Sequence, residues 1–156
     1  MPRRLTKVTL QALDWLIMRT GRAEVRAEHQ QTGRRGEEAA YFHLRQLGYV
    51  VVARNFRSPR RRGEIDMVAW NGDVLCFVEV KTRTTRDVKP AHVAVDREKQ
   101  RELIGMAREY LHHVRGNPPW RVDIVSVYFE GPNTGQGVTS ATKPQIELFK
   151  NAFPVS

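Results

Sequence analysis

The dipeptide Asn71-Gly72 is the feature that most narrows the folds open to this chain, because it stands between two strand-like runs. A two-residue type I′ turn needs positive φ at both central positions, which Asn and Gly adopt most easily. The flanking runs, residues 64–70 and 74–83, are rich in β-branched and apolar residues, and the second stays apolar up to its charged end. The sequence therefore predicts an antiparallel hairpin whose second strand is central in a sheet.

Helical and strand-like patterns surround this hairpin. Apolar residues at helical spacing predict a helix over residues 36–47 and another that Asp96 caps and that ends before Asn117-Pro118-Pro119. Further strands are predicted over residues 49–53, 121–129 and 145–149, with polar loops over residues 54–63, 84–94 and 130–144. This order of elements implies an α/β domain with a mixed sheet and helices packed on its faces.

The composition limits the possible partners. The 156 residues suit one domain, and no apolar run approaches the roughly 18 residues that span a bilayer, so we expect no transmembrane segment. A net charge of +9 favours polyanions, with nucleic acid first and an anionic membrane surface second. The single cysteine, Cys76, cannot form an internal disulfide, and a reducing cytoplasm is the expected location.

The first 32 residues differ from the rest of the chain. Residues 5–18 carry apolar side chains at helical spacing, whereas residues 22–32 are almost entirely polar. We therefore predict an amphipathic helix and a polar linker over residues 1–32, followed by a domain over residues 33–153.

Four charged side chains share one face of the predicted hairpin. With Asn71-Gly72 as the turn, Glu64 pairs directly with Glu79. Asp66 then lies on a diagonal from Glu79, at roughly 7 to 8 Å between backbones. Because side chains alternate along a strand, one face carries the charged residues Glu64, Asp66, Glu79 and Lys81. The opposite face carries the apolar residues Ile65, Met67, Cys76, Val78 and Val80.

Three carboxylates on one face repel one another. At about 7 Å and an effective dielectric constant near 20, each pair costs about 2 kcal/mol. Lys81 offers one compensating charge, and a divalent cation with oxygen ligands offers more. We expect Mg²⁺ or Mn²⁺ rather than Zn²⁺, because neither Cys nor His lies near this face in sequence. Hydrolysis of a phosphate ester follows as the natural chemistry, since a cation can activate water while Lys81 stabilises charge.

A plainer reading is a solvated strand face with cross-strand ion pairs. Two features favour a site instead. Glu79 and Lys81 belong to the most apolar strand of the chain, and Glu64 faces Glu79 where a sequence selected for stability would pair opposite charges.

Arginines flank the acidic face from both sequence directions. Such runs are often solvated, but here they suit contacts with phosphates that carry no sequence information. The candidates for nucleic-acid binding are Arg34, Arg35, Arg57, Arg60, Arg61 and Arg62.

Three separated motifs also carry a resemblance. Gly33-Arg-Arg-Gly36-Glu37, Gly63-Glu-Ile-Asp66 and Phe77-Val-Glu79-Val-Lys81-Thr-Arg83 resemble the bacterial YraN family of poorly characterised proteins. That family is similar in turn to archaeal Holliday-junction resolvases and to the restriction-endonuclease-like superfamily. The resemblance extends over residues 33–153 and includes Lys99 and Arg121-x-Asp123.

The resemblance implies a restriction-endonuclease-like three-layer fold, with a mixed central sheet flanked by helices. The superfamily pattern of an acid followed by Glu-x-Lys matches Asp66, Glu79 and Lys81, and Glu37 matches the helix-borne acid that completes the metal site. The expected catalytic set is therefore Glu37, Asp66, Glu79 and Lys81, with the three acids as ligands of Mg²⁺ or Mn²⁺. Glu64 is expected beside this set without being a ligand.

These observations lead to the hypothesis of a metal-dependent DNA endonuclease that acts on branched DNA or on recombination and repair intermediates. The resemblance implies a 5′-phosphate product, and symmetric junction cleavage would require a homodimer. Two alternatives stay open: a nucleic-acid-binding protein without turnover on the same fold, and a membrane-surface adaptor that uses residues 5–18.

Overall fold

The computed structural model describes residues 5–83, 95–129 and 143–155, with the backbone alone for residues 5–25. The chain forms two compact units, residues 1–34 and 35–156. Among the described residues, no helix is both long and apolar enough to cross a membrane. The loop predicted over residues 84–94, residues 130–142 of the loop predicted over residues 130–144, and the apolar side chains of residues 5–18 lie outside what the structure describes.

Helix α1 continues without interruption from Leu5 to Gln46. The helix predicted over residues 36–47 is therefore confirmed up to Gln46, but it is the end of a longer helix, and the prediction of a polar linker over residues 22–32 is wrong. Residues 22–31 consist largely of Arg, Ala, Glu and Gln, which are strong helix formers, so polarity alone does not end the helix. Gly33 and Gly36 each lower helix stability by only about 1 kcal/mol relative to Ala.

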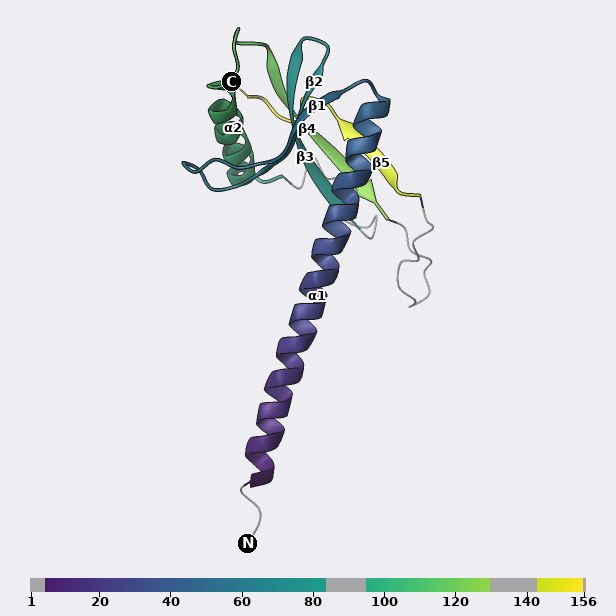
Figure 1. Cartoon of the computed structure of the whole chain (residues 1–156), viewed down its shortest axis with the longest axis vertical. Coiled ribbons are helices and arrows are strands. Elements are labelled where there is room, and N and C mark those ends of the chain that lie inside the picture. Colours follow the sequence, from purple (N-terminus) through teal and green to yellow (C-terminus); the bar gives the residue numbers. More distant parts are fainter. Residues whose placement is uncertain (1–4, 84–94, 130–142, 156) are drawn as a thin grey trace. The chain divides into compact units, whose positions relative to one another are not determined.

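A five-stranded mixed sheet forms the centre of the unit 35–156 (Figure 1). Its strands lie side by side in chain order: β1 (Val50–Phe56), β2 (Ile65–Asn71), β3 (Val74–Arg83), β4 (Trp120–Tyr128) and β5 (Gln145–Phe149). Strands β3 and β4 are parallel, and the other neighbouring strands are antiparallel. The prediction that β3 is central is confirmed, and the parallel connection from β3 to β4 includes helix α2 (Arg97–Leu111).

The hairpin turn lies one residue further along the chain than predicted. Asn71 pairs with Val74, so the two central residues are Gly72 and Asp73. Gly72 has a φ of 61°, which suits the first position of a type II′ turn. The paired positions shift by two residues, and because side chains alternate with a period of two, the paired residues from Met67 to Val78 stay on their predicted faces.

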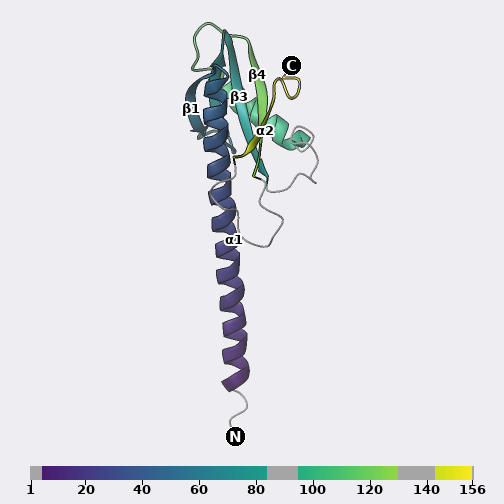
Figure 2. The same cartoon turned by 90° about the vertical axis from the view of Figure 1, so that its right-hand side faces the viewer.

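The sheet buries apolar side chains on both faces, with the last turns of α1 on one side and α2 on the other (Figure 2). The side of α1 contains Ala40, Leu44, Tyr49, Met67, Ala69, Cys76, Val78, Val125, Val127 and Phe129. The side of α2 contains Ile65, Val68, Leu75, Phe77, Val95, Leu103, Met106, Ala107, Val122, Ile124 and Phe153. These observations establish a mixed α/β unit with a helix on each face of its sheet.

Two core residues depart from the sequence pattern. Ile65 lies on the α2 side, because β2 pairs with β3 only as far as Met67 and the chain before it follows β1 alone. Leu47, predicted to continue the apolar stripe of α1, is 49% exposed, and Tyr49 is buried instead.

Candidate functional site: a carboxylate cluster at β3

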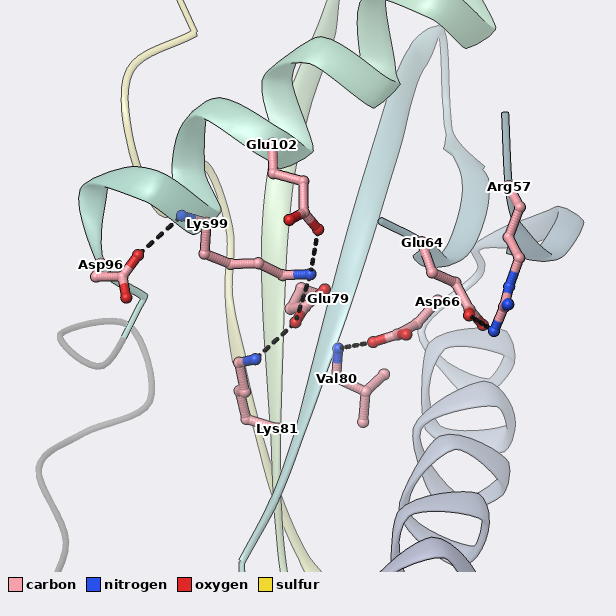
Figure 3. A network of polar contacts seen from close by, with 9 residues as sticks. All are labelled: Arg57, Glu64, Asp66, Glu79, Val80, Lys81, Asp96, Lys99 and Glu102. Carbon is pink, nitrogen blue, oxygen red and sulfur yellow. Dashed lines mark hydrogen bonds and ion pairs between the residues drawn. The ribbon is translucent and has the colours of Figure 1, made fainter. Parts of the chain in front are cut away.

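Strands β2 and β3 separate at the position of Asp66. Their ladder ends with the pair Met67–Val78. Beyond it, Asp66 Oδ2 accepts a hydrogen bond of 2.6 Å from the backbone N–H of Val80 (Figure 3). The side chain of Asp66 thus takes the place that a backbone carbonyl would occupy in a continued ladder, and this fixes the carboxylate beside β3.

Glu79 lies on β3 next to this point and is 4% exposed. Its Oε1 accepts a hydrogen bond of 2.6 Å from Lys81 Nζ and lies 3.7 Å from Lys99 Nζ. Lys99 also donates a hydrogen bond of 2.9 Å to Glu102 Oε1 (Figure 3). One buried carboxylate is therefore in contact with two ammonium groups, one from its own strand and one from α2.

Helix α2 brings Lys99 to β3 because of its N-cap and its amphipathic pattern. Asp96 Oδ1 accepts a hydrogen bond of 2.8 Å from the backbone N–H of Lys99, which confirms the predicted cap. From sequence, Lys99 is indicated only by the resemblance, and Glu102 is not predicted as part of the site. Their spacing of three residues on a helix that packs against the central strand was the available signal.

The electrostatics link Asp66 to three of the other predicted residues. Burial and the charge of Glu79 raise the pKa of Asp66 to about 7, and Glu37 adds to this, whereas the Val80 hydrogen bond and Lys81 act in the opposite direction. Burial lowers the pKa of Lys99, but its hydrogen bond to Glu102 and the charge of Glu79 outweigh it, and the net shift is upward. We refer to Glu37, Asp66, Glu79, Lys81 and Lys99 as the β3 cluster.

Gly36 allows α1 to carry Glu37 toward this cluster. A Cβ atom at residue 36 would lie 1.8 Å from Thr82 Oγ1, so only glycine permits this approach of α1 to β3. Glu37 Oε2 accepts a hydrogen bond of 3.2 Å from Asn55 Nδ2. Asn55 was predicted to lie in a loop and not to belong to the site. In the structure it lies on β1 with a φ of 51°.

Glu64 makes its contacts away from Glu79. Its Oε1 accepts a hydrogen bond of 2.8 Å from Asn55 Nδ2, and its Oε2 pairs with Arg57. Glu64 precedes β2, and the predicted direct pair with Glu79 is absent from the β2–β3 ladder. The revised register explains this, since continuing the ladder by one pair would place Asp66 opposite Glu79.

The cluster can be compared with the needs of a divalent cation. Asp66 and Glu79 offer hard oxygen ligands, which Mg²⁺ prefers. In the described part of the chain, no group of three or more His, Cys, Asp or Glu side chains is arranged to hold a metal ion. Mg²⁺ at phosphate-processing sites is held by one or two carboxylates together with water and substrate phosphates, so Asp66 and Glu79 suffice by ligand type and number.

The predicted nucleic-acid-binding arginines have different surroundings. The guanidinium of Arg35 lies 5.0 Å from the ring centre of Phe129. Arg57 pairs with Glu64, and Arg60 lies 3.6 Å from Glu109. The guanidinium of Arg61 lies against Gly105 of α2. Arg34 and Arg62 are exposed.

A second polar network is buried at β4, near the other end of the hairpin. Asp123 Oδ1 accepts hydrogen bonds from Arg121 Nε at 2.8 Å and from the backbone N–H of Asn151 at 2.9 Å, and its Oδ2 accepts one from the hydroxyl of Tyr49 at 3.3 Å. Arg121 Nη2 also donates to the Tyr49 hydroxyl and to Asn71 Oδ1. We call these residues the Asp123 cluster.

Fold and site together describe an α/β protein with a carboxylate-rich cluster where its central strand leaves its neighbour. Residues 36–127, which include the whole β3 cluster, match the model of a family described as Uncharacterised protein family UPF0102. A UPF0102 protein of Koribacter versatilis (strain Ellin345) is 51% identical over 129 residues, covering 83% of each chain. The chain therefore belongs to the UPF0102 family, which confirms the resemblance to YraN proteins.

Two further relatives extend this similarity. A UPF0102 protein of Solibacter usitatus (strain Ellin6076) is 43% identical over 124 residues, which cover 78% of this chain and 84% of the relative. One of Porphyromonas gingivalis (strain ATCC BAA-308 / W83) is 38% identical over 129 residues, which cover 83% of this chain and 88% of the relative.

Proposed function

We propose that this protein is a metal-dependent endonuclease that hydrolyses DNA phosphodiesters with Mg²⁺ or Mn²⁺. The observation that carries the proposal is the β3 cluster, in which Asp66 and Glu79 lie close enough to interact where β2 and β3 separate, with Lys81 beside them. Buried acids whose pKa is shifted by a like-charged neighbour are typical of functional sites.

The roles follow from the chemistry of each group. Asp66 and Glu79 hold the cation, and Glu37 serves as a further acid from α1 that adds negative charge to the site. When bound, the cation supplies an activated water and neutralises charge on the phosphate. Lys81, whose ammonium lies 2.6 Å from Glu79, stabilises the negative charge that develops during attack at phosphorus.

The architecture supports the same proposal. A mixed sheet with a helix on each face, an acid at the start of β2, and Glu-x-Lys on the adjoining β3 correspond to the order expected of restriction-endonuclease-like proteins. The net charge of +9 supports DNA as the partner. Branched DNA is the first substrate class to test, and a homodimer is the assembly that symmetric cleavage would need.

The proposal is tested by a nuclease assay on linear, nicked and branched DNA with Mg²⁺, Mn²⁺ or EDTA. Asp66→Asn, Glu79→Gln and Lys81→Ala should each lower metal-dependent cleavage by about 100-fold or more, since each removes a ligand or an electrostatic group used in the transition state. Asp73→Asn is the matched control, because Asp73 is an exposed carboxylate in the hairpin turn. Equal cleavage by wild type and all four variants would reject the enzyme.

A binding protein without turnover is the second candidate. One observation favours it: two lysines, Lys81 and Lys99, already neutralise Glu79 without any metal. On this alternative, the purified protein binds branched DNA in EDTA and shows no cleavage with either cation on any substrate of the panel.

A further inference from the structure

Three exposed arginines form a stripe along α2. A helix turns by about 100° per residue, so Arg101 and Arg108 lie about 40° and 20° around the axis from Arg97. All three side chains are exposed. At about 1.5 Å of rise per residue, they span about 16 Å, the length over which one DNA strand presents about five phosphates.

Next to the arginine stripe, a second stripe of α2 carries its glutamates. The arginine-rich loop over residues 57–63 packs against this second stripe. Arg60 lies 3.6 Å from Glu109, and Arg61 lies against Gly105. A Cβ atom at residue 63 would lie 2.3 Å from Glu102 Oε1, which brings the loop backbone close to that side chain. The loop 57–63 therefore lies along α2, and its arginines add positive charge beside the arginine stripe.

This arrangement changes which cations are available to an anionic partner. Arg57 and Arg60, predicted from sequence as phosphate contacts, each have a carboxylate neighbour. Among the residues that the structure describes, Arg97 and Arg101 have no such ion pair, and Arg108 donates to the backbone carbonyl of Val155 at 3.4 Å. Among the described residues, arginines without a carboxylate partner thus lie on α2 as well as in the loop, at Arg97, Arg101, Arg61 and Arg62.

We propose that Arg97, Arg101 and Arg108, together with Arg61 and Arg62, form a surface that binds the phosphate backbone of duplex DNA. This inference rests on the proposed function and deepens it, because it names the side chains that would hold the DNA. Lys99 of the β3 cluster lies about 160° around the α2 axis from Arg97 and Arg101, so the stripe and the cluster are on different faces of α2. The contacts are with phosphates only, so binding is independent of sequence.

The surface suits nucleic acid better than a lipid bilayer. Helices that lie in a membrane interface insert large apolar side chains beside their basic residues. The exposed large apolar residues in the described part of this chain are Phe42, Leu47, Val50 and Val52, and none belongs to α2 or to the loop 57–63. An arginine stripe without such residues favours a polyanion in water.

The test is the salt dependence of duplex binding in EDTA, measured by fluorescence anisotropy. The triple variant Arg97→Gln, Arg101→Gln, Arg108→Gln should lose about two to three units of the log-log salt slope, at about 0.9 per phosphate contact. The control triple variant Arg45→Gln, Lys143→Gln, Lys150→Gln removes the same charge from exposed positions elsewhere and should change the slope by less than about one unit. Thermal unfolding checks that both variants are folded.

Equal effects of the two triple variants would overturn the proposal, because they would show that net charge alone determines binding. Binding of the wild type to phosphatidylserine vesicles but not to DNA would also overturn it. If the wild type cleaves DNA and the two triple variants have equal salt slopes, the proposed DNA-binding surface is rejected and the proposed endonuclease activity is retained. If the two triple variants differ in salt slope as predicted and the wild type shows no cleavage, the DNA-binding surface is supported and the proposed endonuclease activity is rejected.

Discussion

Each of the two polar clusters contains an aspartate at the sheet, fully buried for Asp123 and half-buried for Asp66, and the two carboxylates have opposite kinds of neighbours. Asp123 is fully buried and accepts hydrogen bonds from a guanidinium, a backbone N–H and a hydroxyl. Asp66 accepts one backbone N–H, and its strongest charged neighbour is another carboxylate, Glu79. Donors from the chain compensate the charge of Asp123. In the β3 cluster, the strongest charged neighbour of Asp66 is a second carboxylate.

The pKa values follow the same division. Burial and the charge of Asp123 raise the pKa of Tyr49 to about 12, so its hydroxyl remains a donor at neutral pH. Burial and the charge of Glu79 raise the pKa of Asp66 to about 7, so this group changes protonation near neutrality. On the function proposed above, the Asp123 cluster stabilises the fold and the β3 cluster supplies the groups for chemistry.

The largest effect should come from the Asp123 cluster. Asp123→Asn leaves the half-buried guanidinium of Arg121 without its carboxylate, and we expect a loss of about 3 to 5 kcal/mol in the free energy of unfolding. Urea denaturation at pH 7.5 measures it. Asp66→Asn in the same assay with EDTA should be neutral or stabilising. Destabilisation of both variants by several kcal/mol would break the comparison, because Asp66 would then also be a structural group.

A smaller effect concerns the pH dependence of the free energy of unfolding, to which Asp66 of the β3 cluster contributes. The folded-state pKa of Asp66 is raised from 3.8 to about 7, so between these values the folded chain holds a proton that the unfolded chain has lost. The free energy of unfolding should therefore fall as pH rises from about 4 to 7, by about 2 kcal/mol from this group in metal-free buffer. Asp66→Asn removes that dependence, because asparagine keeps the acceptor for Val80 and cannot ionise.

Denaturation of wild type and Asp66→Asn at pH 5 and pH 8 measures this difference. We expect similar stability of the two proteins at pH 5 and higher stability of the variant at pH 8. A wild type that gains stability relative to Asp66→Asn on going from pH 5 to pH 8 would show that Asp66 is stabilised as an anion.

The sequence was sufficient for the order of the elements, because alternation, caps and turn residues are local signals. Strand β3 and strand β5 begin and end where they were predicted. The turn was misplaced by one residue because Asn-Gly can stand at more than one position of a tight turn, and tertiary pairing of β2 with both neighbours decides between them. The error did not change the faces of the paired residues from Met67 to Val78, since it moved the pairing by two, whereas Asp66 lies before this ladder and bonds the backbone of β3.

What the sequence could not supply were contacts between distant elements. Asn55 connects Glu37 to Glu64 only because α1, β1 and the start of β2 meet, and Gly36 is needed only because Thr82 lies against it. The same holds for the Asp123 cluster, where the hydroxyl of Tyr49 reaches Asp123 across 74 residues. Sequence patterns within a single helix or strand contain no information about such tertiary contacts.

The smallest predicted effect tests whether α2 belongs to the β3 cluster. Lys99 lies 3.7 Å from Glu79 Oε1, and Glu102 holds it there. Lys99→Gln removes one of two ammonium groups that compete with a divalent cation for Glu79, so Mn²⁺ affinity should rise by about three- to tenfold, or about 1 kcal/mol. Electron paramagnetic resonance of free Mn²⁺ measures it without any cleavage, and Lys150→Gln is the control for net charge. If Lys99→Gln instead lost several kcal/mol of stability and bound Mn²⁺ no better, Lys99 would serve Glu79 as Arg121 serves Asp123, and the β3 cluster would be a second structural network.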